Sequence, residues 1–464
     1  MELVRGMNMI FVVTFASKVP RVIRVLVAQS LLIFTLFPVA FASGASEQHL
    51  LQGQLIPDSL VSLSSDNGPS YAILVEKDTQ SVMVYEYEKT FALKHRFVCS
   101  TGEVRGNKEK SGDRKTPEGI YFFTKAFNKR ELSPIYGNRA FVMDYPNLLD
   151  RKLNRGGNNI WLHGTNKPIK SRDSNGCVVM DNDDLEILAR YISLNRTPII
   201  INQKLYMVPA DSQLADKESL QGFLEVWKTA FVIGDRAKYR ACYSEPSADL
   251  DTLWEAWDGI RTAWHHAQIP FDMRLRNLTL VRGNPCVVAL FDEVVSLDHH
   301  VITAGTKKLF LEKNGKTWKI LGETYQPSVL DQGADRPLVM ALNRLDRLRR
   351  DHRAISDLVA EWAEAWSSKD IRRYRACYAE DFWSRGMNLK AWIRYKEGLN
   401  KRYDAIRVSI EDLEIQQGPE RSTATFLQRY DSSGYESVGI KRLRLKRTGG
   451  AWKIYRETWR RVRK

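Results

Sequence analysis

The sequence predicts a multidomain protein in which a mostly β domain is followed by two tandem α+β domains. The chain has 464 residues, and at roughly 100–200 residues per domain this length accommodates two to four domains. β-prone runs dominate residues 71–203, whereas residues 218–461 contain one pattern twice, 135 positions apart. Because 43% of the residues are hydrophobic and 27% are charged, disorder as the main state is excluded.

The N-terminus has the three-part pattern of an export signal. Basic residues precede an apolar run from Val25 to Phe37, and the small residues Ala40 and Ala42 then mark a cleavage site. We expect residues 1–42 to be removed and the protein to be exported to the periplasm or cell envelope. The apolar run covers about 20 Å as a helix, short of the roughly 30 Å of a hydrocarbon core, so the protein contacts a membrane only if this segment is uncleaved. Residues 43–70 are polar and are expected to be a linker or a short accessory segment.

Charge and metal-ligand patterns exclude two classes of partner. The net charge of +15 is spread along the chain, so it does not predict nucleic-acid binding. No Cys-x-x-Cys pair occurs, and the neighbouring residues in His265-His266 and His299-His300 point apart on a strand and do not share a helix face. We therefore expect neither a metal site nor a cofactor.

The β-rich region opens with a hairpin. Two β-prone runs, Tyr71 to Val75 and Ser81 to Tyr87, are separated by four polar residues, and a last strand runs from Pro198 to Ile201. Between them, Thr116-Pro117-Glu118-Gly119 is expected to form a turn that shapes a cleft, with no catalytic role for Glu118.

The remainder is duplicated. An apolar helix face recurs 135 positions later, as does the sequence around Tyr239 to Tyr243, and a terminal Trp-Lys-Ile strand recurs after 134 positions. Two helices followed by a curved sheet resemble the cone-shaped nuclear-transport-factor-two-like (SnoaL-like) fold. We place the copies at 218–327 and 350–461, with a linker from Gln326 to Pro337. Core packing is expected for Cys242, Cys377 and the Trp-rich helix faces, and the basic C-terminus is expected to be solvated.

The two candidate catalytic residues lie at the ends of two apolar runs. His163 ends the run Ile160-Trp161-Leu162, and Cys177 opens the run Val178 to Met180. If these strands are neighbours, an imidazole can take the proton of a thiol and later return it to a leaving amine. Gly176 lets the backbone approach a carbonyl, and the adjacent amides of Gly176 and Cys177 could stabilise its oxyanion.

The combination of His-Gly-Thr at 163–165, Ser-x-Gly-Cys at 174–177 and the upstream Thr-Pro-Glu-Gly resembles the L,D-transpeptidase catalytic domain. The resemblance covers about residues 71–203 and implies a β-sandwich-like fold that acts on peptidoglycan stem peptides. Residues 141–147 and 156–161 are most similar to the branch of cell-shape-determining L,D-carboxypeptidases, which also carries a transport-factor-like domain downstream.

The resemblance implies a role for each site residue. Cys177 would attack the diaminopimelate carbonyl and expel D-alanine to leave a thioester, with His163 as base and the Gly164 carbonyl holding its second nitrogen. Resolution of the thioester by water makes a carboxypeptidase, and resolution by an amine makes a transpeptidase; both remain open.

The sequence departs from the family pattern beside the cysteine. Asn175 stands where the family usually has His, and Val179 where many members have Arg. Substrate binding is therefore assigned to Ser174 and Asn175, with Lys170 and Arg172 as replacements for the missing cation. A second hypothesis is a catalytically degenerate envelope scaffold whose tandem domains bind a glycan, a peptide or a protein.

Overall fold

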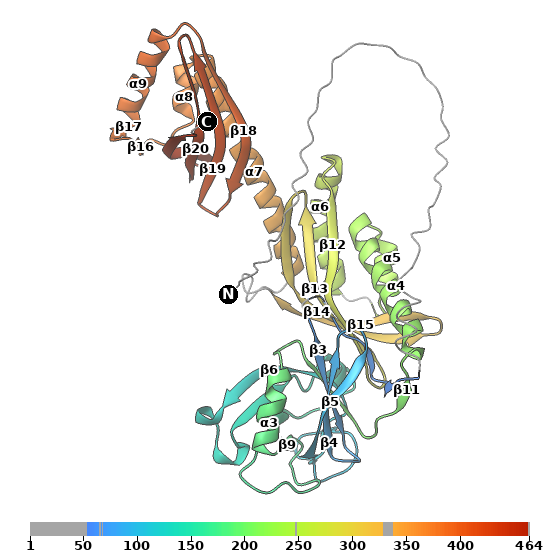
Figure 1. Cartoon of the computed structure of the whole chain (residues 1–464). Helices are drawn as coiled ribbons and strands as arrows, with labels where there is room; N and C mark the ends of the chain where they lie inside the picture. The colour runs from blue at the N-terminus through green and yellow to red at the C-terminus, as the bar shows by residue number, and fades with distance from the viewer. Residues whose placement is uncertain (1–52, 65, 67, 246–247, 328–336, 463–464) are drawn as a thin grey trace, which may run out of the picture. The chain divides into compact units, whose positions relative to one another are not determined.

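The computed structural model describes residues 53–64, 66, 68–245, 248–327 and 337–462 (Figure 1). The expected export signal lies outside the described residues, as does most of the expected linker from Gln326 to Pro337. Among the helices that the structure describes, none combines the length and the apolar character needed to cross a membrane.

The N-terminal β region forms a closed barrel with strand order β10-β3-β4-β5-β9-β8-β7-β6. The hairpin predicted from the sequence is confirmed, because β3 and β4 pair antiparallel from Ser70↔Tyr87 to Glu76↔Ser81. The sandwich-like fold implied by the resemblance is corrected to a barrel, since β10 pairs with both β3 and β6 and so closes the sheet. The strands are β3 (Ser70–Glu76), β4 (Ser81–Tyr87), β5 (Phe91–Ser100), β6 (Gly119–Asn128), β7 (Arg139–Met143), β8 (Trp161–His163), β9 (Val178–Met180) and β10 (Pro198–Asn202).

Short helices connect these strands. Asn147 caps α2 through its side chain, which accepts from the amides of Leu149 and Asp150. Asp181 caps α3 in the same way. The helical segments are η1 (Lys129–Glu131), η2 (Pro134–Tyr136), α2 (Leu148–Lys152), α3 (Asn182–Leu188) and η3 (Ala189–Tyr191).

Strand β3 is buried on both faces, which its sequence Tyr-Ala-Ile-Leu-Val already indicates. Ile73 and Val75 point into the core of the barrel. Ala72 and Leu74 belong to a second cluster outside the barrel, which also contains Val288 and other residues of the first α+β copy. The barrel therefore packs against a sheet of copy 1 through an apolar layer.

The segment before the barrel is partly folded into both neighbouring units. Strand β1 (Leu55–Pro57) pairs with β11 (Met207–Pro209), and β2 (Leu60–Ser62) adds to the sheet of copy 1 by pairing with β12. In its described part, the region expected to be a linker or accessory segment thus contributes strands.

Copy 1 contains three helices and a four-stranded antiparallel sheet that β2 extends. Trp227, Phe231 and Trp257 fill the space between helices and sheet and are almost completely buried. The elements are α4 (Ser212–Ile233), α5 (Arg236–Ala241), α6 (Ala248–His266), β12 (Phe271–Arg282), β13 (Val287–Leu297), β14 (His300–Asn314) and β15 (Thr317–Pro327).

Copy 2 repeats this arrangement, as the duplication predicts (Figure 1). Its elements are α7 (Pro337–Ser367), α8 (Ile371–Ala376), β16 (Trp383–Ser384), β17 (Met387–Asn388), α9 (Leu389–Arg402), β18 (Ile406–Gln416), β19 (Arg421–Ser432), β20 (Tyr435–Thr448) and β21 (Ala451–Arg461).

Helix α7 belongs to both copies. Its first part places Leu338, Leu342 and Leu345 in the core of copy 1, and its second part places Val359 and Trp362 in the core of copy 2. The boundary expected at residue 350 falls inside this helix, in the stretch between Leu345 and Ile355 where no side chain is buried.

Candidate active site

His163 and Cys177 lie on the same face of two adjacent strands. β8 and β9 are parallel neighbours, with Leu162 opposite Val178 and His163 opposite Val179. Leu162 and Val178 are fully buried in the barrel core. Since side chains alternate along a strand, His163 and Cys177 both point to the outer face, two register positions or roughly 6–7 Å apart along the strand direction. The two strands are neighbours, which is the condition that proton transfer between the two side chains requires.

The imidazole of His163 is held in one tautomer. Its Nδ1 lies 2.6 Å from the carbonyl oxygen of Gly164. A carbonyl oxygen only accepts, so Nδ1 donates and Nε2 is left as an acceptor, which is the form that a base requires. Burial lowers the pKa of His163 below its ordinary 6.5, partly opposed by the Gly164 carbonyl, so the ring is neutral near neutral pH. The contact with Gly164 is the one expected from the sequence.

Aromatic rings fix the orientation of this histidine. The ring of Tyr136, at the end of η2, meets His163 edge-on with centroids 5.0 Å apart. Tyr136 also packs on Trp161, which in turn stacks on Phe127. The buried Nε1 of Trp161 has no hydrogen-bond partner among the described residues. The sequence analysis did not predict this packing of aromatic rings on His163, because Phe127 and Tyr136 are distant from the His-Gly-Thr motif in sequence.

Cys177 is a partly exposed residue, whereas the other four cysteines are buried. All five cysteines are free and lie in the described part of the chain. The Cys177 Sγ lies 3.6 Å from the Asn159 carbonyl oxygen. Burial raises the pKa of Cys177, while a backbone hydrogen bond from Trp161 and the positive charge of Lys108 lower it. The resting group is thus a thiol that needs a base before it can attack.

The loop before Cys177 is held by its own hydrogen bonds. Ser174 Oγ donates to the Cys177 carbonyl at 2.7 Å and accepts the Gly176 amide at 3.1 Å. Gly176 has a φ of +122°, and a Cβ there would lie 2.8 Å from the Lys115 carbonyl oxygen, so glycine is required. Because the Gly176 amide is already bonded to Ser174, the Cys177 amide is the better candidate for an oxyanion donor.

Among the described contacts, neither Lys170 nor Arg172, the predicted replacement cations, contacts the thiol of Cys177. Arg172 Nη2 donates to the Lys77 carbonyl at 2.7 Å and lies 3.7 Å from Asp78, so its guanidinium serves the β3–β4 turn. Lys170 and Asn175 are exposed. Arg172 thus supports the β3–β4 turn, and the substrate roles of Arg172, Lys170 and Asn175 stay predictions.

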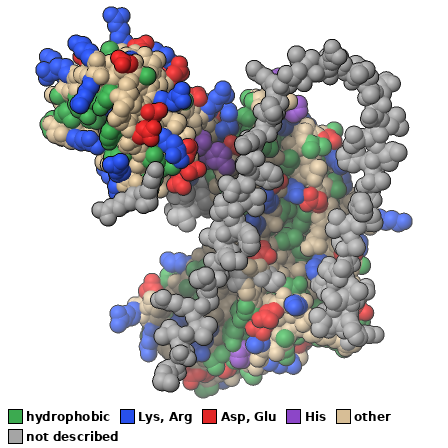
Figure 2. Space-filling model, turned by 45° about the horizontal axis from the view of Figure 1, so that its top comes forward, with side chains coloured by type: hydrophobic (Ala, Val, Ile, Leu, Met, Phe, Trp, Pro, Cys, Tyr) green, Lys and Arg blue, Asp and Glu red, His purple; other side chains and the backbone are tan. Residues whose placement is uncertain are grey.

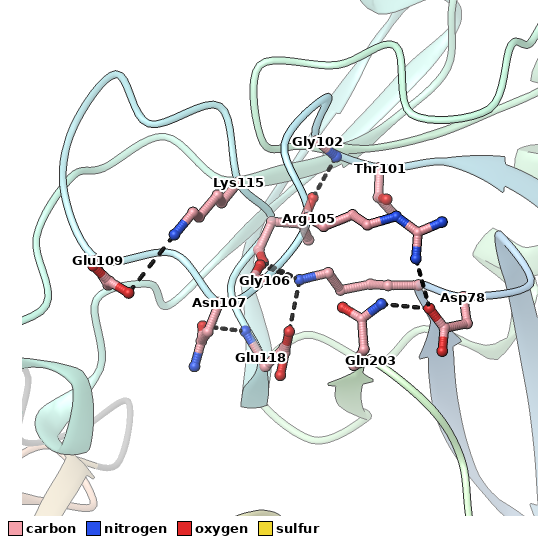
Figure 3. A network of polar contacts seen from close by, with 12 residues as sticks. Asp78, Thr101, Gly102, Arg105, Gly106, Asn107, Glu109, Lys115, Glu118 and Gln203 are labelled. Carbon is pink, nitrogen blue, oxygen red and sulfur yellow. Dashed lines mark hydrogen bonds and ion pairs between the residues drawn. The ribbon is translucent and has the colours of Figure 1, made fainter.

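The Thr-Pro-Glu-Gly segment forms part of a buried polar network (Figure 3). Lys77 is 1% exposed, and its Nζ donates to the Thr116 carbonyl at 2.9 Å, to the Gly106 carbonyl at 2.5 Å and to Glu118 at 2.8 Å. The Gly102 amide donates to Thr116 Oγ1 at 2.8 Å. The carboxylate of Glu118 is thus used for structure, in line with the expected turn.

A buried ion pair that the sequence did not reveal includes Lys108, whose charge lowers the pKa of Cys177. Lys108 Nζ lies 2.6 Å from Asp113 Oδ1, and both side chains are almost completely buried. Asp113 also accepts the amides of Glu109, Lys110 and Lys115, which fixes the loop. Gly157 packs on the Lys108 side chain, where a Cβ would lie 2.9 Å from Cε. A Lys-Asp pair in a turn-rich loop is too common to be recognised from sequence alone.

Metal ligands do not gather in the described residues. No group of three or more His, Cys, Asp or Glu side chains there has an arrangement that could hold a metal ion. Lys and Arg side chains are spread over the visible face instead of forming one patch (Figure 2).

Comparison with family models places two regions of the chain. Residues 70–201 match the L,D-transpeptidase catalytic domain, and residues 354–458 match the Cds6 C-terminal NTF2-like domain. The chain contains an L,D-transpeptidase catalytic domain and a C-terminal NTF2-like domain. His163, Cys177 and the loops around them belong to the first of these. Copy 2 is the NTF2-like domain that the second match covers, and the described part of copy 1 has the same order of helices and long strands without a counterpart of β16 and β17.

The solved structures that match the chain include two bacterial proteins. Bd1075 of Bdellovibrio bacteriovorus is 22% identical over 88% of this chain and 99% of its own, with a TM-score of 0.34. The helical cell shape determining protein Pgp2 of Campylobacter jejuni is 23% identical over 60% of this chain and 99% of its own, with a TM-score of 0.46. No curated protein matched the chain by sequence.

Proposed function

We propose that the protein is an exported cysteine enzyme that attacks the diaminopimelate–D-alanine bond of peptidoglycan tetrapeptide stems. The observation that carries the proposal is the placement of a neutral imidazole and a partly exposed thiol on one face of adjacent strands in an L,D-transpeptidase catalytic domain. Export is inferred from the sequence pattern of residues 1–42.

The first half of the reaction forms a thioester. As Sγ of Cys177 bonds to the carbonyl carbon, Nε2 of His163 takes the thiol proton. The Cys177 amide donates to the developing oxyanion. When the carbon–nitrogen bond breaks, the imidazolium returns the proton to the leaving amine of D-alanine. The hydrogen bond from Nδ1 to Gly164 holds the ring in the required tautomer throughout.

The second half decides between two activities. If water attacks the thioester with His163 as base, the products are a tripeptide stem and the free thiol, and the enzyme is an L,D-carboxypeptidase. If an amine attacks, a new peptide bond forms and the enzyme is an L,D-transpeptidase. The residues that form the site serve both outcomes.

Muropeptide digestion tests the proposal. The mature protein is incubated with purified tetrapeptide muropeptides, and the products are resolved by chromatography and mass spectrometry. Tripeptide with free D-alanine indicates carboxypeptidase activity, and a cross-linked or amine-exchanged product indicates transpeptidase activity. Binding without turnover would favour the scaffold hypothesis and overturn the enzyme.

Substitution of Cys177 gives the sharpest control. Cys177→Ala is expected to abolish turnover, with loss of at least about 10³-fold in kcat, and to leave the fold intact. Iodoacetamide should label Cys177 in the native wild-type protein much faster than the four buried thiols. Activity in Cys177→Ala, or equal labelling of all five thiols, would contradict the assignment.

The pH profile tests the base. Because burial lowers the pKa of His163, the neutral form persists below the ordinary value of 6.5. We expect kcat/KM to stay high as the pH falls through 6.5 and to decline only at lower pH, when the imidazole is protonated. A decline that begins well above 6.5 would contradict this environment.

A further inference from the structure

The outer face of the copy 2 sheet, which points away from the helices, carries basic side chains in cross-strand rows. The inward residues of β19, β20 and β21 fill the core of copy 2, so the residues that alternate with them point outward. Arg421, Lys446 and Lys453 lie opposite one another in one row, and Arg444 lies opposite Arg456 in the next. We call the six outward bases of these strands the basic face: Arg421, Arg442, Arg444, Lys446, Lys453 and Arg456.

The charge of the basic face is largely unbalanced. Within the described part of the chain, the one ion pair of these six side chains joins Lys446 to Asp381 at 2.7 Å. Strand β18 adds two acids to the same side of the sheet, Glu411 and Glu414, and Glu411 is paired with Arg429. Like charges directly opposite each other destabilise a sheet. The rows therefore cost folding free energy, which indicates that an anionic partner offsets their charge.

A shallow hollow lies over the basic face. Its volume is about 470 Å³, and its lining includes the exposed side chains of Arg421, Arg442 and Arg444. Thr423 and Tyr455 add hydroxyl groups, and no carboxylate side chain belongs to the described lining. Guanidinium groups bind the oxygens of a phosphate through paired hydrogen bonds. The hollow is thus suited to a phosphate group.

The same face of copy 1 is already an interface. Its six matching positions hold only two bases and also an acid, namely Cys286, Lys308, Phe310, Glu312, Lys319 and Gly322. Phe310 packs in the apolar layer shared with the barrel, and Lys308 Nζ lies 2.5 Å from Asp144 of the barrel. This sheet face can therefore dock on a partner surface, and in copy 2 the apolar contacts are replaced by positive charge.

We propose that the basic face docks the protein on an anionic phospholipid bilayer. The bases extend over three neighbouring strands, about 10 Å across, so a planar layer of headgroup phosphates can meet all of them, whereas one small anion cannot. The ring of Tyr455 lies 5.6 Å from Cζ of both Arg421 and Arg456, and such an aromatic ring with a polar tip is typical of a membrane interface.

This contact does not depend on the N-terminal segment or on the cysteine. In contrast to the membrane contact considered from the sequence, it does not need residues 1–42. None of the six bases belongs to the barrel that carries His163 and Cys177. Binding to vesicles and turnover of muropeptides in solution are therefore separate properties that can be measured on the same sample.

Vesicle co-sedimentation tests the proposal. The chain from Ser43 onward, the expected mature form, is mixed with vesicles of phosphatidylcholine alone or with roughly one third phosphatidylglycerol. We expect at least about tenfold tighter binding to the anionic vesicles, with a steep fall as salt is added. Equal binding to both vesicles, or binding to neither, would overturn the proposal. So would binding to soluble polyphosphate without retention on the anionic vesicles, which would assign the face to a soluble polyanion.

Matched double variants locate the surface. Arg442→Ala with Arg444→Ala removes two charges from the basic face and should weaken binding to anionic vesicles by roughly tenfold or more. Arg372→Ala with Arg394→Ala removes the same charge from exposed positions on α8 and α9 and should change binding by less than about twofold. Circular dichroism checks that both variants are folded. Unchanged affinity in the first variant, or an equal loss in the second, would refute the basic face as the docking surface.

Discussion

The two α+β copies share a buried polar scaffold and differ in what surrounds it. In copy 1, Trp227 Nε1 donates to the Tyr243 hydroxyl at 3.2 Å, and that hydroxyl donates to Glu323 at 3.0 Å. In copy 2, Trp362, Tyr378 and Glu457 make the same contacts, both at 2.8 Å. A lysine from the third strand completes each network. Duplication has thus preserved the contacts that join the first helix to the last strand.

The outer faces of the two sheets show the clearest difference. Strand β13 of copy 1 is buried along nearly its whole length, whereas β19 of copy 2 alternates between buried and more exposed positions. Val288, Leu290 and Phe310 of copy 1 pack in the apolar layer shared with the barrel. Arg444 occupies the register position of Phe310 in copy 2 and is exposed. The outer face of this sheet can therefore pack on another domain or face solvent, depending on whether its side chains are apolar or polar.

The largest difference in stability between the copies is expected when the carboxylate on the last strand of each sheet is removed. Glu457→Gln leaves Lys441 buried without its ion-pair partner, and we expect copy 2 to lose about 3–5 kcal/mol of unfolding free energy. Glu323→Gln should cost copy 1 less, because Lys307 keeps Glu293. Hydrogen exchange of peptides from β20 and β14, measured by mass spectrometry, reports each copy separately. Equal losses of unfolding free energy would contradict the view that Lys441 has one carboxylate partner whereas Lys307 has two.

The next largest effect on stability is expected at the outer sheet face of copy 1, which packs against the barrel. Phe310→Ala opens a cavity in the layer between the barrel and copy 1 and should cost about 3 kcal/mol. The matched substitution Arg444→Ala lies at an exposed position and should change stability by less than about 0.5 kcal/mol. Calorimetric unfolding of both variants checks this difference, which would vanish if the layer were unimportant for stability.

We expect the buried ammonium of Lys396 to lower the unfolding free energy of copy 2. Lys396→Met keeps the length of the side chain and removes a buried polar group without a partner, so we expect copy 2 to gain about 1–3 kcal/mol. Arg261→Met in copy 1 is the control and should give no comparable gain. A loss of stability in Lys396→Met would mean that the ammonium is well stabilised by the aromatic rings.

The smallest expected effect is a pH dependence of opposite sign in the two copies. Burial lowers the pKa of Lys396 well below 10.5, with Glu457 opposing and Lys441 and Arg385 adding to the shift. Between that lowered value and 10.5 the unfolded chain binds the extra proton, so copy 2 gains stability as the pH rises.

Copy 1 should respond in the other direction and at higher pH. Although burial opposes it, the pair of carboxylates raises the pKa of Lys307 above 10.5, so its contribution is complete below 10.5 and is lost as the pH rises further. Exchange-derived stabilities between pH 8 and 10 should therefore rise for copy 2 and stay level for copy 1 with respect to these lysines. Lys396→Met should flatten the rise, and an unchanged slope would rule out this lysine as its source.

Much of the architecture followed from the sequence because it depends on local pattern. The apolar stripe of α4 and its copy in α7, the β3–β4 hairpin and the two short strands around His163 and Cys177 are all contiguous signals. The contact of His163 with the Gly164 carbonyl was implied by the family resemblance of the His-Gly-Thr motif. The catalytic roles themselves stay predictions.

Contacts between distant segments could not be read in this way. The sequence by itself determined the repeated helix–sheet pattern and the strand ends that carry His163 and Cys177, since periodicity and turn residues act over a few positions. Only the tertiary structure decided that Arg172 contacts the β3–β4 turn, that Lys108 pairs with Asp113 in a buried position and that Lys396 lies on aromatic rings. The physical reason is that the partner of a buried charge is chosen by packing between elements, which leaves no periodic trace in the chain.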